Sequence, residues 1–504
     1  MKLTAPATAL SAALATAFLS LPAAAGGALT FSNKWTFSHD KAGGFLSEIV
    51  AFDSTTSTLW VAGVTGVDVL DLGSGTRVGE RIDVTGFGSI NSVSISNGLA
   101  AFAIESTVRT APGVVKLYDT ATRSLTSGTN SIAVGALPDM LTFTRNGSKL
   151  LVANEATPST YGPLTSVPGV FPRAYGPAAG DPVGSVSIID MASRSVVATA
   201  SPNGAPTSGS RIRTNTGMDY EPEYIAVNAA GTRAYVTLQE ANAIGVLNLQ
   251  TNSFEKVIGL GVKDFSQPGN SIDPLNNGVV DFISVAAKGL YMPDGVATYE
   301  KSGRTFVLMA NEGDFREDDG DRSAGSNLGA VAPLNNLRVS NTDSSAGDLY
   351  TAGARSFSIR DVDGNIVYDS ADILDRAAFK AGVYDDSRSR DKGVEPEGIE
   401  VLAIGDRTFA FVGLERTTKS AIGIFDVTDP ATTSFVDLLV SGTDVSPEGL
   451  KGFMAGGNYY LALSNEVSST TSVYQLTPIP EPGTYALMLA GLGAVAAASR
   501  RRKR

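Results

Sequence analysis

The stretches DYEPEYIAV (residues 219–227), GVEPEGIEV (393–401) and VSPEGLKGF (445–453) share one pattern: proline, an acid and then a short apolar run. Short runs of this kind, bounded by Gly, Asn, Asp and Pro, fill the chain between its two ends, and patterns of long helices are few. Such runs are typical of β-strands. Their recurrence along 504 residues indicates a chain built from structural repeats.

Alignment on the acid before the apolar run gives seven units. The first runs of these units are SEIVAF, INSVSI, PDMLTF, PEYIAV, PDGVAT, PEGIEV and PEGLKG. Two further runs follow in each unit, and often a fourth. The repeat predicts an all-β fold, a seven-bladed β-propeller of four-stranded antiparallel blades, in which the stretch 29–37 completes the seventh blade. The rival prediction is two β-sandwich domains.

Several predicted connections between strands are long, and long loops on a compact scaffold are usually functional or disordered. They span residues 156–184, 202–219, 263–290, 313–355 and 376–392.

The N-terminal residues 1–25 are predicted to be a signal peptide. Lys2 supplies a positive charge, residues 9–21 are apolar, and three alanines at 23–25 fit the rule for a cleavage site. The alternative is a buried apolar helix. The predicted propeller then spans residues 29–477, and because the chain has no cysteine, its core must supply the stability without disulfides.

The C-terminal residues 478–504 have three parts in order: Pro480, Glu481 and Pro482, an apolar run at 484–499, and the basic cluster RRRKR at 500–504. This segment resembles a PEP-CTERM sorting signal of Gram-negative bacteria. The resemblance implies passage across the inner membrane, processing by an exosortase, and a cell-surface or extracellular location. The export and exosortase machinery are then partners of the two termini. The alternative is a retained C-terminal membrane anchor.

Two acidic positions recur in the units. The first opens the first strand, with Asn91 in its place in the second unit: Glu48, Asp139, Glu223, Asp294, Glu397 and Glu448. The second ends the next strand in every unit but the first: Glu105, Glu155, Glu240, Glu312, Glu415 and Glu466. In antiparallel neighbours, the start of one strand and the end of the next lie at the same edge. The pattern therefore predicts about a dozen carboxylates at one mouth of a central channel.

Many like charges in one place are costly unless they are neutralised or hydrogen-bonded. One interpretation is structural, with each acid accepting hydrogen bonds from backbone N–H groups of the neighbouring blade. The other is that some acids bind hard cations, Ca²⁺ first. The candidate metal ligands are Glu223, Asp294, Glu312, Asp314 and Glu397.

The loop NEGDFREDDGDRSAGSN, residues 311–327, is the most acidic stretch of the chain. It does not have the spacing of an EF-hand, so it is either a Ca²⁺-binding loop or a solvated acidic loop. Further basic residues, Arg388, Arg390 and Lys392, lie in or near units that share the acidic mouth. Arg316 and Arg416 are the candidate anion-binding residues, because guanidinium groups pair with phosphate or with acidic sugars.

Composition excludes or disfavours several classes of chemistry. With no Cys and one His, His39, a Cys nucleophile is impossible and zinc sites rich in His or Cys are excluded. The chain lacks a Walker A motif and a GxGxxG after a strand, so no nucleotide cofactor is expected. Haem and zinc are not expected either, and Ca²⁺ is the one candidate cofactor. The net charge of −12 argues against a nucleic-acid partner.

The body, about residues 29–477, resembles the choice-of-anchor I family. The residues that carry the resemblance are VANE at 152–155, DYEPEYIAV, MANEGDFRE at 309–317 and GVEPEGIEV. The resemblance implies a shared body with differing C-terminal anchors. It also implies similarity to mesenchyme-specific cell-surface glycoproteins, to members labelled alkaline phosphatase and to propellers of the phytase kind.

Two functions follow as hypotheses. The first is an exported, surface- or matrix-associated propeller, stabilised by Ca²⁺, that binds a partner such as an exopolysaccharide. The alternative is a Ca²⁺-dependent phosphoesterase, in which bound cations polarise the phosphoryl group and activate water. The fold alone does not choose between them.

Overall fold

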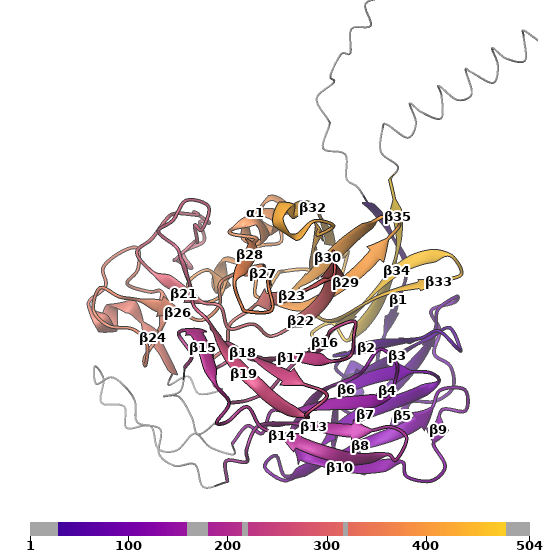
Figure 1. Cartoon of the computed structure of the whole chain (residues 1–504). Coiled ribbons are helices and arrows are strands. Elements are labelled where there is room, and N and C mark those ends of the chain that lie inside the picture. Colours follow the sequence, from indigo (N-terminus) through magenta and orange to yellow (C-terminus); the bar gives the residue numbers. More distant parts are fainter. Residues whose placement is uncertain (1–28, 159–179, 214–219, 316–320, 480–504) are drawn as a thin grey trace, which may run out of the picture. The chain divides into compact units, whose positions relative to one another are not determined.

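The repeats fold as separate antiparallel sheets, seen in a computed structural model that describes residues 29–158, 180–213, 220–315 and 321–479 (Figure 1). Strands dominate, and α1 (Ile373–Lys380) is the one α-helix in these ranges. This confirms the all-β prediction. None of the helices in these ranges is long and apolar enough to cross a membrane. The predicted signal peptide and the C-terminal segment from Pro480 onward lie outside the described residues.

The larger sheets follow the repeats in chain order. The first three are β2 (Val50–Asp53), β3 (Thr58–Gly63), β4 (Gly66–Asp71) and β5 (Ile82–Asp83); β6 (Ser89–Ser96), β7 (Leu99–Glu105), β8 (Pro112–Asp119) and β10 (Ser131–Ala136), with β9 (Ser124–Leu125) beside β8; and β11 (Pro138–Phe143), β12 (Lys149–Asn154), β13 (Ser185–Asp190) and β14 (Ser195–Ala200). The fourth is β16 (Ile225–Val227), β17 (Arg233–Leu238), β18 (Ala243–Asn248) and β19 (Ser253–Leu260), with β15 (Thr207–Ser210) parallel to β19.

The remaining large sheets have four strands each. They are β22 (Val296–Lys301), β23 (Arg304–Asn311), β27 (Ser356–Arg360) and β28 (Ile366–Asp369); β29 (Pro396–Ile404), β30 (Arg407–Leu414), β31 (Ala421–Asp426) and β32 (Ser434–Val440); and β33 (Pro447–Ala455), β34 (Asn458–Asn465), β35 (Thr470–Pro478) and β1 (Leu29–Ser38). Four-stranded antiparallel sheets are therefore the unit of the fold, as the repeat predicts.

The first strands of the sheets contact one another in sequence. β2 contacts β6, β6 contacts β11, β11 contacts β16, β16 contacts β22, β22 contacts β29, β29 contacts β33, and β33 contacts β2 again. The hydrophobic core lies between neighbouring sheets. Trp60 of β3 packs in one cluster with Phe102 of β7, and Phe357 of β27 in another with Phe425 of β31. Each sheet thus buries its faces against the sheets beside it, as repeat units do.

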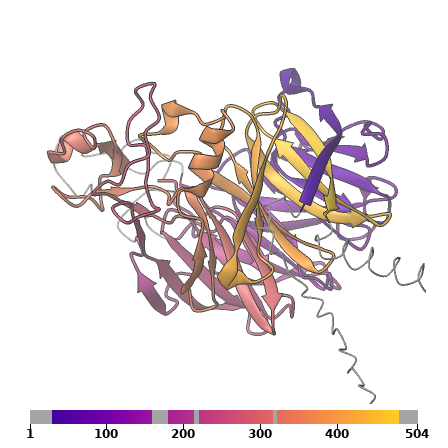
Figure 2. The same cartoon turned by 90° about the horizontal axis from the view of Figure 1, so that it is seen from above.

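The N-terminal strand completes the last sheet. β1 pairs antiparallel with β35, from Leu29 opposite Pro478 to Ser38 opposite Thr470. Figure 2 shows this indigo strand beside the yellow C-terminal strands. The predicted pairing of residues 29–37 with the last unit is confirmed.

Two of the predicted long loops fold together. The stretch 263–290 and the described part of 313–355 form the sheet of β20 (Val262–Asp264), β21 (Lys288–Leu290) and β26 (Tyr350–Thr351) and the pair β24 (Arg322–Ala324) and β25 (Arg338–Ser340), gathered at one side in Figure 1. They enclose a hydrophobic cluster of their own that includes Phe265 and Leu337. The loop 376–392 carries the end of α1 and a short 3₁₀ turn, Asp386–Arg388.

The Pro-acid motif has a local structural cause. The residue before the proline has a left-handed backbone at Leu137, Met292, Glu395 and Ser446, with φ between 43° and 63°. The register with the next strand shifts just after the proline, for example between Pro396 and Ile399. The acid stands at the start of its strand. The turn and the bulge together turn its side chain toward that edge of the sheet, because a bulge bends the strand and re-aims its side chains.

Candidate functional site

The acids at the ends of the inner strands line one cavity of about 460 Å³, here called the acidic cavity. Asp314 lines it, together with ten of the twelve predicted carboxylates. These ten are Glu48, Glu105, Asp139, Glu155, Glu223, Asp294, Glu312, Glu397, Glu415 and Glu448. Glu240 and Glu466 are not among the lining residues. The predicted gathering of the acids at one end of the strands is therefore confirmed for most of them.

The structural interpretation of the acids on the first strands is wrong in its detail. Gly295 N donates to the backbone carbonyl of Glu397 at 3.2 Å, and Gly449 N donates to that of Glu48 at 2.9 Å. The contacts between neighbouring sheets thus run through the backbone of the acid. Within the described residues, no backbone N–H is bonded to the side chains of the six acids: Glu48, Asp139, Glu223, Asp294, Glu397 and Glu448.

Burial and mutual repulsion act on these carboxyl groups. Burial first, and neighbouring carboxylates second, raise the pKa well above its usual value at Glu48, Glu223, Asp294, Glu397, Glu415 and Glu448. Burial, with Glu155 and Glu105 nearby, raises the pKa of Asp139 to about 8. The acidic cavity therefore disfavours its own ionised form, and a proton or a cation relieves it.

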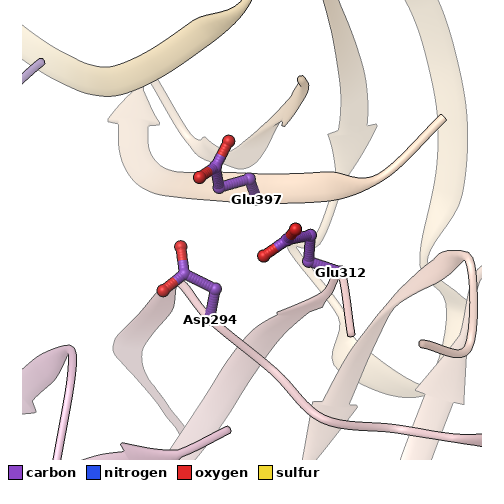
Figure 3. Close-up of side chains that lie close together, drawn as sticks. All are labelled: Asp294, Glu312 and Glu397. Carbon is purple, nitrogen blue, oxygen red and sulfur yellow. The ribbon is translucent and has the colours of Figure 1, made fainter. Parts of the chain in front are cut away.

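Asp294, Glu312 and Glu397, here called the Asp294 group, each offer a carboxylate oxygen within 4.8 Å of the others. In Figure 3 the three carboxylates point toward a common space. Asp294 comes just before β22, Glu312 just after β23, and Glu397 from the start of β29. Two oxygens bound to one Ca²⁺ at about 2.4 Å lie no more than about 4.8 Å apart, so the spacing fits this ion.

Glu223 adds an unsatisfied oxygen beside the Asp294 group. Its residue is 8% exposed, and its Oε2 atom is buried without a hydrogen-bond partner. Glu397 Oε2 is in the same state. Glu312 Oε2 accepts a hydrogen bond of 2.8 Å from Gln239 Nε2. Buried carboxylate oxygens without donors are rare and point to a ligand or a proton.

Glu312 belongs also to a second group with Glu395 and Glu415, here called the Glu395 group. Lys392 Nζ lies 2.6 Å from Glu312 Oε1 and 2.9 Å from Glu395 Oε2. Arg388 Nε donates to Glu395 Oε1 at 2.6 Å, and Arg416 Nη2 lies 2.6 Å from Glu415 Oε1. Burial alone would lower the pKa of Lys392, but the carboxylates around it, first that of Glu312, raise it well above its usual value.

The structure brings together most of the predicted site. The five candidate metal ligands all line the acidic cavity, and so does Arg416. Asp314 stays apart from the Asp294 group, half-exposed and 4.0 Å from Lys392 Nζ. Arg316 and the sorting residues Pro480, Glu481 and Pro482 lie outside the described residues.

The described acidic side chains of the loop 311–327 do not all face the acidic cavity. Glu312 and Asp314 face the acidic cavity, but Asp321 is fully buried with Arg213 Nη2 at 3.7 Å.

Two residues of the site were not predicted from the sequence: Glu395 and Gln239. The spacing E-P-E, shared by 221–223 and 395–397, is the signal that points to the first. Gln239 stands where other units have the Asn of an Asn-Glu pair.

The family comparisons agree with these features. The choice-of-anchor I domain matches residues 48–430, and the PEP-CTERM protein-sorting motif matches residues 478–503. No curated protein matches the chain. Hydrazine synthase of Kuenenia stuttgartiensis is similar in structure, with a TM-score of 0.48 and 11% identity over 85% of this chain and 94% of that one.

The sorting motif implies export, recognition by the exosortase machinery and a surface or extracellular location. The domain match covers more than half of the sequence, including the Pro-acid motifs at 221–223 and 395–397 and the whole Asp294 group. The chain therefore belongs to the choice-of-anchor I domain family, with a PEP-CTERM sorting motif at its C-terminal end.

Proposed function

We propose that this exported protein is a seven-bladed β-propeller that binds Ca²⁺ at the Asp294 group and, through the bound ion, an acidic polysaccharide at the cell surface. The cycle of contacts from β2 through β33 and back to β2 supports the ring of seven blades. Each blade then contributes its first strand to the channel, and the acidic cavity is one mouth of that channel.

The observation that carries the calcium proposal is the Asp294 group itself. Three carboxylate oxygens lie within 4.8 Å of one another, and buried oxygens of Glu397 and of the adjacent Glu223 have no hydrogen-bond partner. Ca²⁺ prefers carboxylate oxygens and takes six to eight ligands. Three side chains fill only part of that number, so positions remain for water or for a ligand.

The ligand proposal rests on the charges at the same mouth. Arg416 lines the acidic cavity with 44% of its side chain exposed. A Ca²⁺ ion with free coordination positions and a guanidinium group nearby suit a carboxylate-bearing sugar. The surface location implied by the sorting motif brings such sugars within reach.

Calcium titration of the chelator-treated protein tests the site. We expect Ca²⁺ to raise the melting temperature, since an ion at a hundred times its Kd adds about 2.7 kcal/mol to folding. Glu397→Gln should abolish the rise. Glu400→Gln is the matched control, because Glu400 lies on the same strand but lines another cavity, paired with Lys451. An equal rise in Glu397→Gln and wild type would overturn the site.

Co-sedimentation tests the ligand. We expect polygalacturonate, a polymer of acidic sugar, to retain the protein in Ca²⁺ and to release it in chelator. Neutral dextran should not retain it. Retention that persists in chelator, or in Glu397→Gln with Ca²⁺ present, would contradict binding through the ion.

A second candidate function is Ca²⁺-dependent phosphoester hydrolysis. The observation in its favour is that the Asp294 and Glu395 groups share Glu312, as two ions about 4 Å apart would require. Release of nitrophenol from p-nitrophenyl phosphate, dependent on Ca²⁺ and lost in Glu312→Gln, would support it. No release at any Ca²⁺ concentration would remove it.

A further inference from the structure

The Asp294 group and the Glu395 group share Glu312 but differ in their counter-ions. The Glu395 group has three carboxylates and three cations in contact with them, Lys392, Arg388 and Arg416. Within the described residues, no lysine or arginine forms an ion pair with Asp294, Glu397 or Glu223. The chain therefore supplies a cation for every carboxylate of the Glu395 group, but in the Asp294 group only for the shared Glu312.

Lys392 is the centre of the Glu395 group. Its residue is 5% exposed, and its ammonium lies between Glu312 Oε1 and Glu395 Oε2, at 2.6 and 2.9 Å. Glu395 is fully buried and also bonded to Arg388. An ammonium at hydrogen-bond distance from two carboxylates occupies the space that a divalent ion would need to reach both.

We infer that Lys392 is a built-in counter-ion that fills the Glu395 group and limits the acidic cavity to one divalent ion. This inference rests on the proposed calcium site and defines its stoichiometry. It also separates the two candidate functions, because a reaction that uses two metal ions needs the space that the lysine holds.

A buried carboxylate oxygen without a hydrogen-bond partner also marks the Asp294 side of the acidic cavity. Glu223 is 8% exposed and lines the same cavity, and its Oε2 atom has no hydrogen-bond partner. The Asp294 side of the cavity thus keeps a buried acceptor that the chain leaves unsatisfied. On the other side Glu395 Oε2 also has no hydrogen-bond partner, but Lys392 Nζ lies 2.9 Å from it, so a cation of the chain already faces that oxygen.

Isothermal titration of the full chain with Ca²⁺ tests the inference. We expect one ion per wild-type molecule and two per Lys392→Met molecule, because loss of the ammonium leaves room for a divalent ion between Glu312 and Glu395. Lys451→Met is the matched control, since Lys451 pairs with Glu400 in the other cavity, and it should bind one ion. One ion in Lys392→Met would overturn the inference.

A second variant decides the case in which Lys392→Met does not fold. Glu415→Gln removes a carboxylate of the Glu395 group only. We expect its Ca²⁺ affinity to stay within about fivefold of wild type, since Arg416 already pairs with this carboxylate and a paired charge contributes little. A loss as large as that of Glu397→Gln would show that the ion reaches the Glu395 group, against the inference.

The two proposals fail in different ways. If the wild-type protein binds no Ca²⁺, the calcium site itself is wrong. If the wild type binds one ion and Lys392→Met also binds one, the site stands and the role of Lys392 is wrong.

Discussion

Asp139 shows at the scale of a single residue what the crowding of acids does to stability. Burial and the nearby Glu155 and Glu105 raise its pKa to about 8, far above that of a free aspartate. The folded chain therefore holds a proton near neutral pH that the unfolded chain has lost. Stability therefore falls as the pH rises toward the folded pKa, because the unfolded chain is ionised there and the folded chain is not, and the fall ends once the folded carboxylate has also ionised.

We expect the free energy of unfolding of the calcium-free protein to drop by about 1.4 kcal/mol from this group between pH 7 and pH 9. Asp139→Asn cannot ionise, so it should lack this part of the drop. Urea unfolding of both proteins at the two pH values measures it. Parallel losses in wild type and variant would contradict the raised pKa.

Single residues also show how much of the site can be predicted from the sequence. Asp294, Glu312 and Glu397 were found because each occupies a repeated position, and repetition places side chains at equivalent points. Glu395 has no equivalent in most units, and Lys392 reaches Glu312 only through the path of the loop before β29. The path of such a loop depends on packing between residues far apart in the sequence, so the Glu395 group and its counter-ions could not be predicted.

At the scale of the element, the glycine after the acid explains how neighbouring inner strands approach. A Cβ atom at Gly295 would lie 2.3 Å from the carbonyl oxygen of Glu397 on the next strand, and one at Gly449 would lie 2.5 Å from that of Glu48. The motif Pro-acid-Gly thus combines a turn, an acid that faces the acidic cavity and a close backbone contact. The repeated sequence reflects this contact as well as the acid.

We expect Gly295→Ala to lower the free energy of unfolding by about 1–3 kcal/mol, because the added methyl group meets backbone that must shift. Gly442→Ala is the control, since a Cβ there meets nothing within 4 Å. Urea denaturation of the two variants compares them directly. Equal stabilities would mean that the strands separate at no cost and that the close contact is not needed.

The structure inside the long connections could not be predicted from the sequence. The sequence indicates loops at 263–290 and 313–355, but it does not show that β21 and β26 pair in parallel or that Phe265 and Leu337 share a core. The paired residues Lys288 and Tyr350, like Phe265 and Leu337, are far apart in the sequence and lie outside the repeat. Periodicity within a short window carries no information on such pairing.

At the scale of the whole molecule, the two ends of the body meet at one sheet. β1 pairs with β35, and His39, just after β1, joins them to the first sheet. Its Nδ1 atom lies 2.7 Å from Asp68 Oδ2 on β4, and its Nε2 atom lies 2.8 Å from Thr471 Oγ1 on β35. Asp68 is fully buried and also pairs with Arg81 Nη2 at 2.9 Å. The one histidine of the chain thus links β4 of the first sheet to β35 of the last.

Asp68→Asn tests whether this junction holds the cycle of sheets together. Removing one partner of a buried ion pair typically costs about 3–5 kcal/mol, because the charge of Arg81 and the ring of His39 lose their acceptor. Asp83→Asn, on β5 of the same sheet, is the control, since the carboxylate of Asp83 is exposed and hydrogen-bonded only within its own turn.

Urea denaturation gives the loss, and hydrogen exchange shows where it acts. We expect Asp68→Asn to expose the amides of β1 and β35 ahead of those of β30 and β31, since the last sheet then opens first. Burial lowers the pKa of His39, although Asp68 favours its charged form, so the wild-type junction should also weaken as the pH falls below about 6.5. Uniform exchange across all sheets would mean that the ends of the chain carry no special share of the stability, and that the contacts between inner strands close the cycle without them.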